Sequence, residues 1–111
     1  MNSEADNHND GLNVVESVLG LFSTVPDLAL KFNDMFKGDF ALPNIPFKVI
    51  DADGMLWDTL VERNGWRFQQ NEFTRHCRIL DSEGIRRAWG TKNGMLKALK
   101  AFEGKADWQK E

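Results

Sequence analysis

Residues 66–90 decide the fold, and they read WRFQQNEFTRHCRILDSEGIRRAWG. Apolar and polar side chains alternate along most of this stretch, and a period of two is typical of strands that bury one face. Turn-forming residues interrupt the alternation at Asn71 and again at 82–84. We therefore predict three antiparallel strands, over 66–70, 73–80 and 85–90.

The same alternation assigns each side chain to one face of the predicted sheet. The predicted core face carries Trp66, Phe68, Phe73, Cys77, Ile79, Ile85 and Trp89. The opposite face carries a basic stripe that consists of Arg67, His76, Arg78 and Arg86, together with Ala88. Two interpretations of the stripe stay open: a solvated face on which acids such as Glu62 balance the arginines, or a surface that binds nucleic acid.

A closing helix is predicted after the strands. Thr91 is a favourable N-cap, and Met95, Leu99 and Phe102 recur at helical spacing. We expect this helix to pack on the core face of the sheet.

The segment 54–64, before the strands, is ambiguous. Its apolar residues follow a helical stripe, whereas Asn64-Gly65 is a strong signal for a β-hairpin. We slightly favour a helix here, and a strand is the alternative.

Two short amphipathic helices are predicted over 11–38, with a turn near Pro26. These helices could pack on the core, or they could form a detachable arm that binds a partner or a second copy. Membrane-surface binding is the least favoured outcome, because the polar face is acidic rather than basic. The candidate partner-binding residues of the arm are Leu12, Val15, Leu19, Phe22, Leu28, Phe32 and Phe36.

The predicted fold class is α+β, with N-terminal amphipathic helices and a meander-like antiparallel sheet of three to five strands packed by a C-terminal helix. Residues 1–10 are polar and acidic and predict a flexible tail. The α+β domain is predicted over 45–104, and a polar tail over 105–111.

Composition excludes several classes of protein. The chain has 111 residues and a formal charge of −3, which allows one domain. No apolar run is long enough to span a membrane. One cysteine and two histidines provide neither a disulfide nor a zinc-ligand set, so we expect no metal or cofactor and a reducing, cytoplasmic location. Acids outnumber bases over 1–46, and bases outnumber acids over 47–100.

Residues 49–58 resemble the first motif of the haloacid dehalogenase superfamily, in which a strand ends in Asp-x-Asp-Gly-x-Leu. The resemblance implies that Asp51 accepts a phosphoryl group, that Asp53 is the acid/base, and that the site holds magnesium. However, the chain after Leu56 is too short for the core of that family, and a similar turn recurs at 81–84 without catalytic residues. We interpret the motif as a hairpin turn and expect a protein that is not an enzyme.

The leading hypothesis is a small non-enzymatic binding or regulatory module that acts by protein–protein interaction, with another protein or by self-association. The alternative is nucleic-acid binding through the basic face of the three-stranded sheet. For this alternative, the run of residues 86–91 faintly resembles the three-stranded DNA-binding domains of some plant transcription factors and phage-type integrases. The candidate contact residues are Arg67, His76, Arg78 and Arg86.

Overall fold

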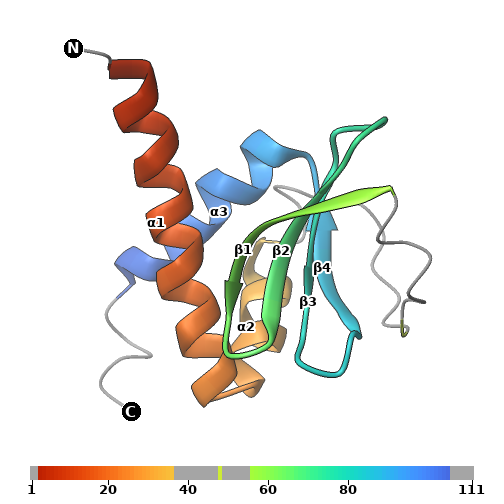
Figure 1. The fold of residues 1–111 in the computed structure, drawn as a ribbon. Coiled ribbons are helices and arrows are strands. Elements are labelled where there is room, and N and C mark those ends of the chain that lie inside the picture. The colour runs from red at the N-terminus through yellow and green to blue at the C-terminus, as the bar shows by residue number, and fades with distance from the viewer. Residues whose placement is uncertain (1–2, 37–47, 49–55, 106–111) are drawn as a thin grey trace.

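The computed structural model of this chain describes residues 3–36, 48 and 56–105. These residues form three helices and a four-stranded antiparallel sheet with the strand order β1-β2-β3-β4 (Figure 1). The elements are α1 (Ser3–Thr24), α2 (Asp27–Phe36), β1 (Trp57–Arg63), β2 (Trp66–Asn71), β3 (Cys77–Leu80), β4 (Arg86–Gly90) and α3 (Lys92–Gly104). The predicted α+β class, with a meander sheet and a closing helix, is confirmed.

Strand β1 replaces the helix that we slightly favoured over 54–64, and that prediction was wrong. Asn64 and Gly65 both have positive φ values, 54° and 88°. A two-residue turn of this kind matches the twist of a hairpin, so it returns the chain directly alongside β1. Pairing runs from Trp57 opposite Asn71 to Arg63 opposite Trp66.

The hairpin of β1 and β2 contacts α1 through hydrogen bonds. The Arg63 guanidinium donates to the Glu16 carbonyl at 3.5 Å, and the Asn64 side-chain amide donates to the Ser23 hydroxyl at 3.0 Å. A Cβ at Gly20 would lie 3.1 Å from the Arg63 guanidinium, so the glycine permits this close approach.

The face assignments at β3 and β4 require corrections. Strand β3 begins at Cys77 rather than at residue 73, so Phe73 lies in a turn and not on the core face. A β-bulge between β3 and β4 then places Ala88 opposite Ile79, where it is buried in the core. Trp89 consequently faces the opposite side, across from Arg78.

Ile85 is half-buried and forms an isolated bridge with Lys48 instead of joining the buried core cluster. The assignment of Ile85 to the core face therefore also fails, since it precedes β4 and lies at the edge of the sheet.

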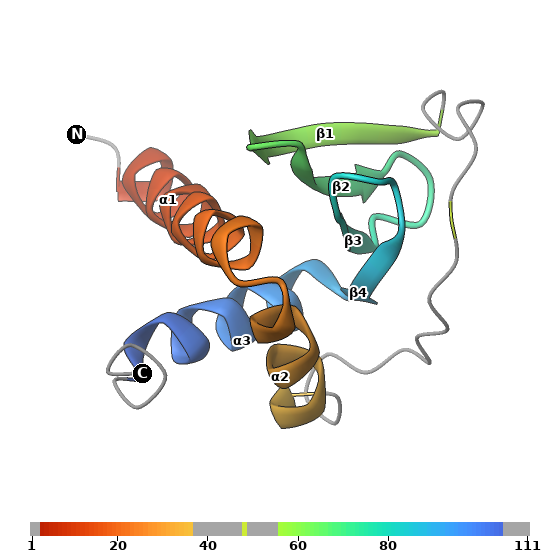
Figure 2. The same cartoon turned by 90° about the horizontal axis from the view of Figure 1, so that it is seen from below.

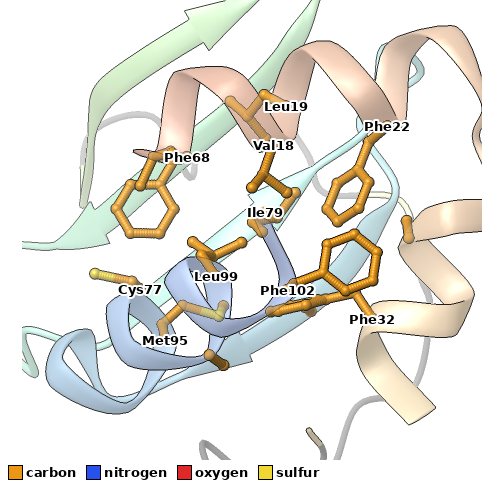
Figure 3. Packing of buried hydrophobic residues seen from close by; sticks show 14 of the residues in the cluster. Val18, Leu19, Phe22, Phe32, Phe68, Cys77, Ile79, Met95, Leu99 and Phe102 are labelled. Carbon is orange, nitrogen blue, oxygen red and sulfur yellow. The ribbon is translucent and has the colours of Figure 1, made fainter. Parts of the chain in front are cut away.

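The core lies between one face of the sheet and the helices (Figure 2, Figure 3). Phe22 of α1 is fully buried, and its ring centroid lies 5.7–5.9 Å from those of Phe32, Trp66 and Phe102. These rings join α1, α2, β2 and α3 in one aromatic cluster. The N-terminal helices therefore pack on the core.

Helix α3 agrees with its prediction. The Thr91 hydroxyl accepts a hydrogen bond from the Gly94 backbone N–H at 3.2 Å, as an N-cap does. Met95, Leu99 and Phe102 are fully buried, as the spacing predicts.

Helix α2 buries only part of its apolar surface. Ala29, Phe32 and Phe36 are buried, whereas Leu30 and Met35 are exposed. Helical geometry places the last two on the flanks of the solvent-facing side.

Helix α1 begins at Ser3, inside the predicted tail over 1–10. The absence of proline before residue 26 allows this long helix. The predicted flexibility of residues 1–10 stays a prediction. Asp51, Asp53 and most of the tail over 105–111 lie outside the described residues.

Candidate functional site

Helices α1, α2 and α3 lie on one side of the sheet, and none of the described helices covers the other side (Figure 2). We call this other side the outer face. Its central row crosses all four strands, because Gln69 pairs with Thr59 and Arg78, and Arg78 pairs with Trp89. Trp57 lies on the same face.

Arg78 is enclosed in the middle of the outer face, with 4% of its surface exposed. Its Nε donates to Gln69 Oε1 at 2.9 Å, and its guanidinium lies 4.0 Å from the centre of the Trp57 ring. Gln69 in turn donates from Nε2 to Thr59 Oγ1 at 2.9 Å. This chain of contacts holds the guanidinium within the sheet surface and stabilises it by a cation–π interaction.

A second stack lies beside the first. The Arg86 guanidinium is 4.5 Å from the centre of the Trp89 ring, and the His76 ring meets Trp89 edge-on at 5.8 Å. Burial lowers the pKa of the Arg86 guanidinium. Both stacks place a tryptophan face against a flat cation.

Asp81 organises the turn between β3 and β4. Its Oδ1 accepts from the backbone N–H groups of Glu83 and Ile85, at 2.8 and 2.9 Å. Its Oδ2 lies 2.9 Å from both Nε and Nη2 of Arg87. The acid-x-acid-Gly pattern of 81–84 therefore makes a turn, as the sequence indicates.

The structure brings the predicted nucleic-acid residues together on one side of the sheet but embeds them to different degrees. Arg67 is half-buried and lies opposite Glu62 in the pairing of β1 with β2. Arg78 is enclosed, and His76 and Arg86 are half-buried against Trp89.

Six of the seven predicted partner-binding residues of the helical arm contribute instead to the interior. Val15, Leu19, Phe22 and Phe32 are fully buried, and Phe36 is nearly so. Leu12 and Leu28 are half-buried, and Leu28 packs against the core. Within this fold these seven side chains do not form an exposed apolar face, so they do not support a detachable arm.

An apolar projection, which the sequence pattern did not indicate, lies at one end of the sheet. Phe73 is 75% exposed, and Leu56 is 43% exposed. The backbone N–H of Glu72 donates to the Leu56 carbonyl at 2.9 Å, which brings the two segments together. We call Leu56 and residues 72–76 the sheet tip (Figure 1).

The turn in the sheet tip is closely constrained. Asn71 Oδ1 accepts from the backbone N–H groups of Phe73 and Thr74, at 2.8 and 2.9 Å. Arg75 adopts a φ of 66°, a conformation that non-glycine residues seldom adopt. The signal for this turn was Asn71, whose side chain can bond to the backbone two residues on.

A groove of about 640 Å³ lies between α1 and α3. The half-buried Val14 and Leu96 supply apolar lining, while Lys97 and Lys100 are exposed on α3. Glu103 also lines the groove. The groove thus combines apolar and charged groups, and this lining suits an apolar side chain that has charged neighbours.

The described residues offer little catalytic chemistry. Burial raises the pKa of the Cys77 thiol to about 11, with smaller opposing effects of Lys92 and Arg75. A thiol of this kind is a poor nucleophile at neutral pH. Among the described residues, no group of three or more His, Cys, Asp or Glu side chains could hold a metal ion.

No family model, curated protein or solved structure is similar enough to this chain to count as a match. Within residues 3–36, 48 and 56–105, no helix is long and apolar enough to cross a membrane.

Proposed function

We propose that this protein is a non-enzymatic binding module that acts through protein–protein contact, and that its contact surface is the sheet tip. The observation that carries the proposal is Phe73, a large aromatic side chain held 75% exposed. Aromatic side chains dominate the energetics of protein interfaces, because each buries a large apolar area when a partner covers it.

The constraint on the turn supports the same proposal. Asn71 fixes the backbone on either side of Phe73, and Arg75 holds a left-handed conformation. Neither feature buries Phe73 within its own chain. A preorganised turn does reduce the entropy lost on binding, which is how a single exposed anchor becomes effective.

Photo-crosslinking tests the proposed surface. A benzophenone amino acid at position 73 is expected to give discrete adducts in cells that express the protein. The matched control carries the same amino acid at Leu30, which is 54% exposed on α2. Equal adduct patterns at the two positions, or no adduct at position 73, would contradict the proposal.

Nucleic-acid binding is the second candidate, and the two arginine–tryptophan stacks favour it. Aromatic faces and arginine planes on a sheet are the groups on which unpaired bases stack. We expect any such binding to weaken steeply with salt. Fluorescence anisotropy with single- and double-stranded oligonucleotides at low salt tests it.

The variants for that test are Arg67→Ala and Arg86→Ala, with Lys97→Ala as the control on α3. Loss of binding in the first two alone supports this candidate, and no binding at low salt rejects it. For either function we propose a cytoplasmic location, which the single free cysteine favours.

A further inference from the structure

We propose that the sheet tip of one copy docks into the α1–α3 groove of a second copy, so that the protein associates head to tail. This inference rests on the proposed function, because it assigns a partner to the same sheet tip. It joins the most exposed large apolar side chain of the described residues to a groove with an apolar lining.

The arrangement of the two surfaces prevents one chain from joining them. The turn of the sheet tip projects from one end of the sheet, whereas α1 and the later turns of α3 lie together away from it in both views (Figure 1, Figure 2). The described part of each chain therefore presents both a projection and a groove. A second copy supplies the complement of each.

Charge complementarity identifies a second copy as the occupant. In the sheet tip, the exposed Glu72 and Arg75 flank Phe73. The groove carries the opposite arrangement, with Lys97 and Lys100 followed by Glu103 along α3.

Docked head to tail, Glu72 faces the two lysines and Arg75 faces Glu103, while Phe73 contacts Val14 and Leu96. Exposed ion pairs add little affinity, but they select the orientation in which the apolar anchor enters.

A head-to-tail contact leaves one free projection and one free groove at the ends of every assembly. Unless the rotation closes a ring, association continues beyond the dimer. The average mass of the purified protein is therefore expected to increase with concentration.

Sedimentation velocity of the full chain over a wide concentration range tests this inference. Phe73→Ala is expected to lower the association constant at least about tenfold, which corresponds to about 1.4 kcal/mol. Leu30→Ala removes an exposed leucine elsewhere and is expected to leave association unchanged. Circular dichroism confirms that each variant retains its fold.

Charge reversal provides a second and sharper readout. Glu72→Lys and Lys100→Glu are each expected to weaken association, and the double variant, which exchanges the charges, is expected to recover it. Both positions are exposed, so the fold tolerates the changes. A double variant that is weaker than either single variant would overturn the proposed pairing.

Mixing variants tests the direction of the contact. Phe73→Ala lacks the anchor but keeps the groove, whereas the Lys97→Glu/Lys100→Glu variant keeps the anchor and alters the groove. An equal mixture is expected to give heterodimers that do not grow further, and a mixture that stays monomeric contradicts the inference.

The failure of this inference differs from the failure of the proposed function. A purified chain that stays monomeric, while the crosslinker at position 73 captures a different protein, overturns only the self-association. A monomeric chain without any adduct at position 73 overturns both.

Discussion

The two faces of the sheet are stabilised by different chemistry. On the core face, Phe68, Cys77 and Ile79 are fully buried under the helices by apolar contact alone. On the outer face, Gln69 and Arg78 are also buried, as is the apolar Leu80, and these two polar side chains are satisfied by hydrogen bonds and a cation–π stack.

The two faces show that a side chain with low solvent exposure does not always belong to the hydrophobic core. On the core face, apolar surface is removed from water, and this stabilises the fold in proportion to the apolar area buried. The outer face encloses polar groups whose hydrogen bonds must be satisfied, since an unpaired buried group is costly. Substitutions on the two faces are therefore expected to differ in size and in mechanism.

The largest effect is expected for Phe22→Ala, which removes the ring shared by α1, α2, β2 and α3. Loss of this buried ring and the cavity it leaves should cost about 3–5 kcal/mol of the free energy of unfolding. Urea denaturation measures the loss, with Leu30→Ala as the exposed control, expected within about 0.5 kcal/mol. Similar losses for both variants would mean that the helices do not share the core.

A smaller loss, about 2–3 kcal/mol, is expected for Arg78→Ala. The substitution removes the stack on Trp57 and leaves Gln69 Oε1 without its donor. A double-mutant cycle with Gln69→Ala should show a coupling of about 1 kcal/mol. Additive losses for the two substitutions would mean that Arg78 and Gln69 are not coupled. The outer face would then not be stabilised by the proposed polar contacts.

The Cys77 thiol on the core face predicts a pH dependence. Its pKa is raised from 9.0 to about 11 in the folded protein, so between these values the folded state holds a proton that the unfolded state has lost. Stability should therefore decrease as the pH rises from about 9 to 11, by about 2 kcal/mol.

Urea titrations at several pH values measure this decrease. Other groups also titrate in this range, so the informative quantity is the difference from Cys77→Ala, which lacks the thiol. A parallel pH dependence in the two proteins would show that Cys77 is not the cause.

The smallest effect is expected for Thr91→Ala, which removes the cap of α3 and with it one bond to the Gly94 N–H. The expected cost is about 1 kcal/mol, measured by thermal unfolding. Thr91→Ser keeps the hydroxyl and should retain most of the stability. If the serine variant loses as much as the alanine variant, the cap does not contribute.

Sequence reasoning identified those parts of the fold that depend on local pattern. The alternation in β2, the Asp81 turn and the Thr91 cap are set by residues close together in the chain. It misassigned Phe73 and Trp89, because strand β3 begins late and a bulge shifts β4 by one residue. Since side chains alternate with a period of two, a shift of one residue exchanges the faces.

The candidate site was less predictable than the fold. Arg67, Arg78 and Arg86 share the outer face, but the stacking of Arg78 on Trp57 depends on β1, which the sequence left ambiguous between helix and strand. The sheet tip was missed because Phe73 fits an alternating strand pattern, and only the Asn71 turn removes it from the strand.

The sequence by itself determined the α+β class, the closing helix and the turns, because capping, turn chemistry and periodicity act over a few residues. The tertiary structure decided that the N-terminal helices belong to the core, and that Phe73 is the most exposed large apolar side chain among the described residues. Such outcomes depend on which surfaces meet across the chain. Local pattern indicates that a surface is apolar, but only long-range packing determines what covers it.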